Sequence, residues 1–580
     1  MAEEVYDFII VGAGPAGCSL ASTLARTIAK PRILLLEAGS KNDNKSHRVV
    51  GKRWMTFQEE SMNWGYKTTP QDGCDGRILD YSRGKGLGGG SAINFGIYTV
   101  GARDDYESWA EIVGDEGFGW DQMQRRFKSL ETFGLGGCGS KEGGKYGNPI
   151  AGDHGHGGAL KVGFAKEWEM DLRPLMDCFE EAGLKRNLDH NSGDPIGMGM
   201  CVHSAGDGVR STAKDLLIDG PGNLIVVTDT PVQRILFDDK RAVGVETKGN
   251  KCGYTLLMRI LGLFAILASK EVILCAGSLD SPKILMHSGI GPACELNKFS
   301  IPIVHDVPAI GQGLKDHFFA PLLLSRNPET NDRNAFFKSE TAMADAMTQW
   351  EEDGTGPWSK YGCQLTIGWF KSDTITSTEE FKALPKSAQR FMNRETIPHY
   401  EVVAGFPIHL LFPGMLSDYS YTCLAVFLMN EQSVGEVRLQ SSNPDDPLLF
   451  DPKILSHPFD QRAVIDMYRH LLEISKHPSF AKDTLATILG PKSESDEDIL
   501  QFWKDNISSS WHMMGTAKMG KIGDHDAAVD NGFRVFGVEG LRVADMSVVP
   551  VLTNNHTQAT AYVTGATCAD VLIREYELDQ

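Results

Sequence analysis

Three glycines and one acid near the N-terminus have the residue types and spacing of a dinucleotide-binding site. Gly12, Gly14 and Gly17 follow a short apolar run, and Glu37 comes 20 residues after the last of them. Gly12 allows a tight turn, Gly14 lets the backbone approach a pyrophosphate, and Gly17 lets a helix pack closely on a strand. An acid at this distance suits a ribose hydroxyl. The pattern predicts a dinucleotide site.

The elements around these residues occur in the order that such a site requires. A strand-like run at residues 7–11 precedes the glycines, and a helical pattern at residues 18–25 follows them. A second apolar run at residues 33–36 leads directly into Glu37. Strand, turn, helix and strand in this order direct the helix N-terminus at the phosphates of the ligand.

A second glycine-rich segment, residues 83–94 (RGKGLGGGSAIN), contains more glycine than a turn needs. Residues 88–90 expose backbone N–H groups, and Ser91 and Asn94 add side-chain donors. Such a concavity suits an anion or the polar edge of a ring. Because apolar residues flank the segment, we interpret it as a buried ligand cradle and not as a surface loop.

The pattern of polar and apolar residues changes between about residues 311 and 506. Long polar helices alternate there with strand-like runs such as residues 421–428 and 435–439, and no glycine fingerprint occurs. This part is expected to form a second domain that supplies most of the substrate pocket. Residues 540–545 then resemble the N-terminal part again, because they form a strand-like run that ends in an acid. Residues 559–576 have a helical pattern.

We therefore predict an α/β fold with two domains. One is a Rossmann-like, discontinuous domain, and the other is built on an antiparallel sheet flanked by helices. Short β-branched runs within residues 224–246 predict a small antiparallel meander in the first. The expected limits are residues 1–165, 205–310 and 525–580 for the dinucleotide-binding domain, and residues 166–204 and 311–524 for the substrate-binding domain.

Composition excludes several classes of partner. The chain has 580 residues and a formal charge of −19, which argues against binding to nucleic acid or to an anionic membrane. The longest nearly apolar segment, residues 260–268, is too short for a membrane span, which needs about 20 residues. We expect it to be a buried strand or helix.

The cysteines and the N-terminus predict a cytoplasmic location. The 11 cysteines are scattered without C-x-x-C spacing, which favours reduced thiols over disulfides or a metal site. The first strand begins within a few residues of Met1, which leaves no room for a secretory signal.

Six motifs in sequence order resemble the glucose–methanol–choline (GMC) family of flavin oxidoreductases, and the resemblance covers essentially the whole chain. In layout the chain is similar to formate oxidase and aryl-alcohol oxidase-like members. The motifs are residues 12–17 with Glu37, 83–94, 277–292, 307–317, 512–516, and 541–545 followed by 556–558. At Gly90 the family usually has serine.

The resemblance implies FAD and not NAD, and a second glycine loop would be surplus to a plain nicotinamide site. Some members bind the flavin covalently through a histidine at the position of Ile93, so we expect non-covalent FAD here. The residues that the resemblance assigns to the cofactor are Gly12, Gly14, Pro15, Ala16, Gly17, Glu37, Ala38, Trp64, Arg83, Gly88, Gly89, Ser91, Asn94, Phe95, Gly96, Val232, Ala276, Trp511, Asp545, Met546, Thr557 and Gln558.

The resemblance also implies oxidation of an alcohol to a carbonyl at a histidine pair. His512 would take the hydroxyl proton, His556 would orient the hydroxyl, and the carbon would give hydride to flavin N5. His556 precedes a helical pattern, and a helix N-terminus disfavours positive charge. We therefore expect His512 to be the histidine that carries the charge which helps O₂ accept an electron. His287, His317 and His409 are interpreted as structural.

Other functions stay open. Relatives in this family cleave cyanohydrins, and others use light to decarboxylate fatty acids; both keep the glycine motifs, because those motifs bind only the cofactor. A third hypothesis is a flavoprotein that acts as a binding module and catalyses no reaction. The two histidines argue against it. Formate is a poor candidate substrate, because formate oxidase has arginine at the position of His556. The identity of the alcohol, the use of O₂ or another acceptor, and the oligomeric state are not predicted.

Overall fold

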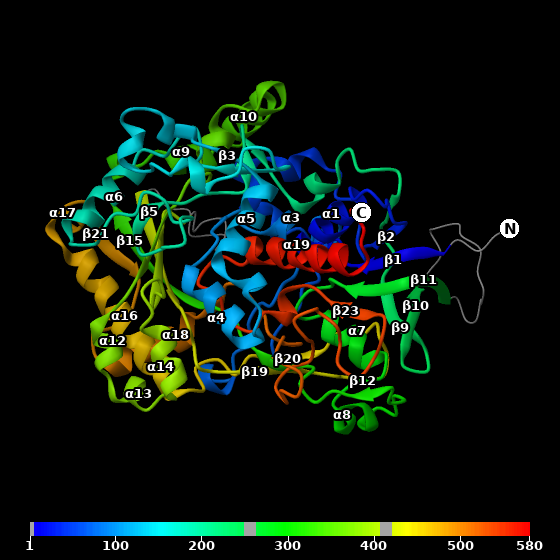
Figure 1. Ribbon diagram of the computed structural model, residues 1–580. Helices are drawn as coiled ribbons and strands as arrows, with labels where there is room; N and C mark the ends of the chain where they lie inside the picture. The colour runs from blue at the N-terminus through cyan, green and yellow to red at the C-terminus, as the bar shows by residue number, and fades with distance from the viewer. Residues whose placement is uncertain (1–4, 249–262, 407–419) are drawn as a thin grey trace.

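The first of two large sheets carries the predicted dinucleotide site. The computed structural model in Figure 1 describes residues 5–248, 263–406 and 420–580. The strands of this sheet lie in the order β8 (Leu224–Val227), β2 (Ile33–Leu36), β1 (Tyr6–Val11), β11 (Leu263–Leu274), β10 (Arg241–Lys248) and β9 (Val232–Asp238), with β23 (Leu541–Val543) also paired to β11.

The predicted strand–turn–helix–strand unit is present. β1 and β2 pair in parallel and are apolar and buried, as expected for strands covered on both faces. Between them lies α1 (Pro15–Ala25), which packs along the C-terminal helix α19 (Gln558–Glu575) near the centre of the molecule in Figure 1. A Cβ atom at Gly565 would lie 2.1 Å from the carbonyl oxygen of Ala16, so this glycine permits the close helix contact.

The meander predicted within residues 224–246 is correct for β9 and β10 and wrong for β8. β9, β10 and the first part of β11 are antiparallel neighbours, but β8 pairs in parallel with β2 at the far edge. The run at residues 224–232 is split because Asp229 has a φ of +54° and Pro231 cannot donate a backbone hydrogen bond.

The apolar run at residues 260–268 was expected to be buried. Residues 260–262 lie outside the described part, and the rest belongs to β11, where Ala265 to Ala268 are only half-buried. β1 begins to pair with β11 at Ala268, so the earlier residues of the strand lie beyond the covered centre of the sheet.

The second sheet is antiparallel and lies on the other side of α19 from the first (Figure 1). Its order is β16 (Thr366–Phe370), β17 (Tyr400–Ala404), β18 (Ser420–Leu428), β15 (Phe318–Arg326) and β21 (Thr484–Leu489), with β22 (Ser508–Ser509) beside β15. Alternate residues of β18 belong to two different apolar clusters, one on each face. Helices α16 (Pro458–Lys476) and α18 (Asp496–Asn506) pack on β18 and β15. The predicted α/β fold class is thus confirmed, while the domain limits stay a prediction.

Several smaller expectations can be compared with the structure. The helical pattern at residues 559–576 corresponds to α19, and residues 435–439 contain β19 (Gly435–Arg438). Within the described ranges, the cysteines are free thiols and no helix is long and apolar enough to cross a membrane. His409 lies outside those ranges.

Candidate active site

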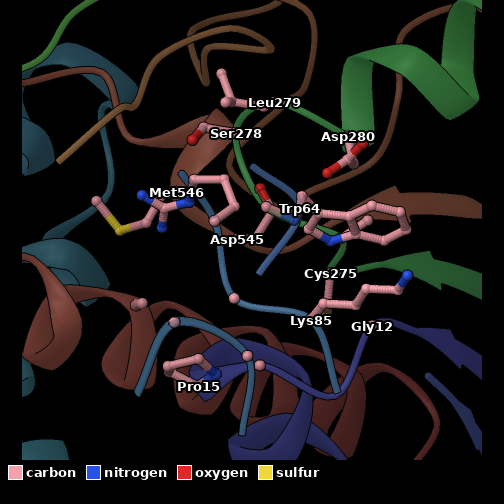
Figure 2. Close-up of a pocket in the computed structure, with 18 of the residues that line it drawn as sticks. Gly12, Pro15, Trp64, Lys85, Cys275, Ser278, Leu279, Asp280, Asp545 and Met546 are labelled. Carbon is pink, nitrogen blue, oxygen red and sulfur yellow. The ribbon is translucent and has the colours of Figure 1, made fainter. Parts of the chain in front are cut away.

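A cavity of about 410 Å³ lies between the glycine loops, the motif that begins at Gly277, and the C-terminal motifs. Its lining includes both histidines of the predicted pair and all predicted cofactor residues except Gly17 and Gly88. In Figure 2, Gly12 and Pro15 lie on one side of the cavity, and Ser278, Leu279 and Asp280 lie on the opposite side.

The three N-terminal glycines occupy the positions that their predicted roles require. Gly12 has a φ of +102°, and a Cβ atom there would lie 2.4 Å from the carbonyl oxygen of Cys275. At Gly17 a Cβ atom would lie 1.9 Å from the carbonyl oxygen of Gly12, so Gly17 packs against the turn and does not face the cavity. A Cβ atom at Gly14 would meet nothing closer than 3.9 Å, which leaves the N-terminus of α1 open toward the cavity.

Glu37 ties the two glycine loops together. Its carboxylate accepts hydrogen bonds from the backbone N–H groups of Ala13 (2.9 Å), Gly39 (2.8 Å) and Gly86 (2.9 Å). An ionised carboxylate has about four acceptor positions, so one stays available for a hydroxyl from the cavity. Glu37 therefore holds the two glycine loops together and also lines the cavity.

The second glycine loop departs from expectation at Ser91. The Ser91 hydroxyl donates to the carbonyl oxygen of Gly88 (2.6 Å) and accepts from Ala213 N, so its proton is not available to a ligand. Its role is to fix the loop. Gly88, the other predicted residue outside the cavity lining, donates its N–H to Ala13 (2.9 Å) and joins the two loops.

Two side chains that line the cavity, Asn94 and Gln558, carry amide groups. Oε1 of Gln558 is buried without a hydrogen-bond partner in the described part, while its Nε2 donates to the carbonyl oxygen of Ile97 (2.5 Å). Oδ1 of Asn94 accepts from Gly96 N and from the buried Arg210, which orients its amide. An orphaned acceptor here fits a ligand ring that carries an N–H group.

His512 is held from both sides. Its backbone N–H donates to Oδ1 of Asp316 (2.7 Å), and its Nδ1 lies 3.0 Å from Nδ1 of His317 and 3.0 Å from Oγ of Ser510. Burial lowers the pKa of His512 well below its usual value, and the neighbouring His556, His317 and Arg83 lower it further. His512 is therefore a neutral base at neutral pH.

His556 stands beside a buried carboxylate. Its Nε2 lies 2.8 Å from Oε1 of Glu401, which belongs to β17 and is 1% exposed. The rings of His512 and His556 meet edge to face, with centroids 4.8 Å apart. Both histidines line the cavity, so one hydroxyl group can lie against both.

This geometry reverses one expectation and corrects another. The positive charge was expected on His512, but burial, together with the neighbouring His556, His317 and Arg83, lowers the pKa of His512. His317 was interpreted as structural only, yet it contacts His512 directly. Burial, with the charges of His556 and Lys315, lowers the pKa of His317 to about 3.

Three aromatic side chains form a wall of the cavity next to His512. The ring centroid of Trp511 lies 4.6 Å from that of Phe57 and 5.6 Å from that of Phe95. Nε1 of Trp511 donates to Asp80 (2.9 Å), and Arg83 donates to the Trp511 carbonyl oxygen. Phe57 directly follows the short helix α2 (Arg53–Thr56).

Residues 6–319 and 431–565 match the family descriptions of GMC oxidoreductases, and the chain belongs to the GMC oxidoreductase family. An alcohol dehydrogenase (acceptor) of Pseudomonas putida is 31% identical over 99% of this chain and 97% of that protein. Pyranose dehydrogenase 3 of Leucoagaricus meleagris is 30% identical over 98% of this chain and 92% of that protein.

Solved structures agree with this fold. A formate oxidase of Aspergillus oryzae superposes with a TM-score of 0.87 at 24% identity over 100% of this chain and 99% of that chain. A fungal aryl-alcohol oxidase superposes with a TM-score of 0.85 at 23% identity over 99% of this chain and 100% of that chain. The family implies FAD, and the glycine cradle, the free acceptor on Glu37 and the orphaned Gln558 oxygen fit that cofactor.

Several residues of the site were not predicted from the sequence. Glu401 could have been noticed as an acid within an apolar strand, and His317 as the residue after Asp316 in a motif that was already identified. Lys248 and Asp445 also line the cavity, where they are bonded to each other from separate segments, and no sequence signal connects them. Within the described residues, no cluster of three or more His, Cys, Asp or Glu side chains is arranged to hold a metal ion.

Proposed function

We propose that this protein is an FAD-dependent oxidoreductase that oxidises an alcohol to a carbonyl compound at His512 and His556. The observation that carries the proposal is the pair itself: two imidazole rings with centroids 4.8 Å apart line one cavity with the glycine loops. Relatives named as alcohol, pyranose and choline dehydrogenases support it.

The cofactor would be held without a covalent bond. The glycine loops and the N-terminus of α1 suit the pyrophosphate, Glu37 suits the ribose, and Gln558 suits the ring. Ile93 lines the cavity where some relatives have a linking histidine, and its aliphatic side chain cannot form that link. When bound, FAD supplies the acceptor for the two electrons that the alcohol loses.

The histidines handle the proton. His512 is neutral, so it can take the hydroxyl proton of the substrate, a step worth roughly 10²–10⁴ in rate. His556 orients the hydroxyl oxygen, and the Glu401 carboxylate at 2.8 Å supports positive charge on its ring. A positive His556 also stabilises negative charge that develops on the substrate oxygen.

The surroundings favour an alcohol with a flat apolar body. Phe57, Phe95 and Trp511 form an aromatic wall beside His512, which suits an aryl group. A cationic alcohol would need a free carboxylate, and the Glu401 carboxylate is already paired with His556. Benzyl-type primary alcohols therefore fit better than choline-like ones.

The rival readings make different predictions in one experiment. The purified yellow protein is mixed anaerobically with aryl, aliphatic and sugar alcohols while absorbance near 450 nm is followed. Bleaching by benzyl-type alcohols supports the proposal. Recovery in air with release of peroxide would identify an oxidase, and bleaching without recovery would identify a dehydrogenase with another acceptor. A flavin that no alcohol bleaches would contradict alcohol oxidation and favour the cyanohydrin lyase or the photodecarboxylase.

A further inference from the structure

Two short contacts of Nδ1 of His512, and one further contact of Ser510, determine where the proton of the His512 ring lies. Oγ of Ser510 lies 2.8 Å from the carbonyl oxygen of His317, and the same Oγ lies 3.0 Å from Nδ1 of His512. A carbonyl oxygen has no proton, so the single proton of the Ser510 hydroxyl must point to it. The contact with His512 must then be a hydrogen bond donated by Nδ1–H.

The contact with His317 follows from this assignment. Nδ1 of His317 lies 3.0 Å from Nδ1 of His512, and two imidazole nitrogens at this distance need one proton between them. Because His512 carries that proton, Nδ1 of His317 accepts it. His317 then carries its own proton on Nε2, which is buried without a partner in the described part of the chain.

The opposite arrangement is less favourable. If His317 donated to His512, the lone pairs of His512 Nδ1 and Ser510 Oγ would face each other at 3.0 Å. An orphaned atom would remain at His317 Nε2 in either case, so the orphan does not distinguish the two arrangements. The Ser510 contact does.

We propose that His317 is a positioning residue for the base: with Ser510 it accepts Nδ1–H of His512 and so fixes the tautomer whose lone pair is on Nε2. Nε2 of His512 makes no hydrogen bond within the described residues and is not sealed off, and His512 lines the cavity. The substrate O–H bond breaks and its proton moves to this lone pair. A neutral acceptor at Nδ1 then steadies the imidazolium, as a carboxylate does in hydrolase triads.

The role needs a neutral His317, and its surroundings provide one. His317 is 1% exposed, and the positive charges of His556 and Lys315 disfavour a proton on its ring. The charged or titratable groups that face His512 are His556, His317 and Arg83, with Asp316 holding its backbone N–H.

The first test is independent of catalysis. Protein labelled with ¹⁵N only in histidine is studied by solid-state NMR, and the His512 signals are assigned by their loss in His512→Asn. The proposal predicts a neutral ring with protonated Nδ1 and bare Nε2. A His512 ring with bare Nδ1 and protonated Nε2 would overturn it, whatever the substrate of the enzyme proves to be.

The second test is kinetic and rests on the proposed function. His317→Leu removes the acceptor and should lower kcat 10- to 100-fold while KM changes less than about threefold. His317→Asn keeps an acceptor oxygen and should restore most of kcat, which also covers the case in which the leucine variant does not fold. His190→Leu removes another buried histidine, outside the cavity, as a control.

A pH profile separates positioning from mere packing. His317→Asp replaces the neutral acceptor with a carboxylate, which stabilises protonated His512 and should move the acid limb of kcat/KM to higher pH by about one unit. An unmoved acid limb, or full kcat in His317→Leu, would overturn the proposal. If the wild type oxidises no alcohol, the proposed function fails, while the NMR result still decides the tautomer.

Discussion

Oε1 of Glu401 lies 2.8 Å from Nε2 of His556, and both side chains come from segments more than 150 residues apart in the chain. Glu401 lies on β17 of the second sheet, and His556 lies just before α19, which packs along α1, the helix that connects β1 and β2 of the first sheet. The candidate site therefore depends on how the two sheets are held together.

Removing the charge of Glu401 should weaken catalysis without emptying the cofactor site. Glu401→Gln keeps a hydrogen-bonding group beside His556 but loses the negative charge that supports a positive ring. We expect kcat/KM for the best alcohol to fall roughly 10- to 100-fold. Flavin content should stay unchanged, and Glu379→Gln on the surface helix α13 (Glu379–Lys382) is the matched control. Equal kcat/KM in Glu401→Gln and wild type would contradict the role given to this carboxylate.

Gly14 should matter to the cofactor and not to the fold. A Cβ atom at Gly14 meets no protein atom closer than 3.9 Å, but it projects where the backbone should approach the pyrophosphate. Gly14→Ala is therefore expected to keep the wild-type melting temperature of the apoprotein within a few degrees. Its flavin-to-protein absorbance ratio should fall several-fold.

Gly152→Ala is the control for that variant, because a Cβ atom at Gly152 meets nothing within 4 Å and the residue does not line the cavity. It should bind flavin normally. Full flavin occupancy in Gly14→Ala would show that the cofactor does not approach this turn.

The aromatic wall should select the substrate. Phe57→Ala opens the wall beside Trp511, and kcat/KM for benzyl alcohol should fall about tenfold, since an aromatic contact contributes roughly 0.5–1.5 kcal/mol beyond burial. A short aliphatic alcohol provides the internal control, because it does not reach the wall and should lose less. Equal losses for both alcohols would remove the wall from the account of specificity.

His154 should make stability depend on pH far from the active site. Its ring nitrogens lie 3.3 Å from Oε1 of Glu131 and 3.1 Å from Oδ2 of Asp189. Burial alone lowers the pKa of His154, but the hydrogen bonds and charges of Asp189 and Glu131 outweigh it and raise the pKa from 6.5 to about 9. Folding therefore favours the protonated ring, by about 3 kcal/mol.

That stabilisation is fully present below pH 6.5 and is lost as the pH rises through about 9. Melting temperatures measured between pH 6 and 9.5 should fall for the wild type, and less steeply for His154→Gln. The exposed neighbour His156 provides the control variant His156→Gln, which should follow the wild type. Parallel curves for His154→Gln and wild type would contradict a buried imidazolium.

The cofactor end of the site could be predicted because its determinants are local. The turn at Gly12, the packing of Gly17 and the strand that ends at Glu37 lie within one short unit, and each needs a particular residue type. The sequence could not show that the Glu37 carboxylate accepts hydrogen bonds from three backbone N–H groups. It also could not show that the Ser91 hydroxyl donates to the carbonyl oxygen of Gly88.

The substrate-binding part of the site was harder to predict, because its interacting residue pairs are far apart in the sequence. His317 and His512 meet only because β15 pairs with β22, which precedes His512. The environment of His512 could not be foreseen for a related reason: burial and the neighbouring His556, His317 and Arg83 lower its pKa, and the buried Glu401 lies beside His556 from a distant strand. Burial and neighbours set these charges, and a linear sequence shows neither.

The measurement that tests the account most directly is anaerobic stopped-flow mixing of the flavin-loaded protein with benzyl alcohol, for the wild type and for His512→Asn. If His512 is the base, the wild-type flavin is bleached in one turnover, and the flavin of the variant is bleached more slowly by a factor of roughly 10²–10⁴. No bleaching of the wild type by this or any other alcohol, or equal rates in the two proteins, would contradict alcohol oxidation with His512 as the base.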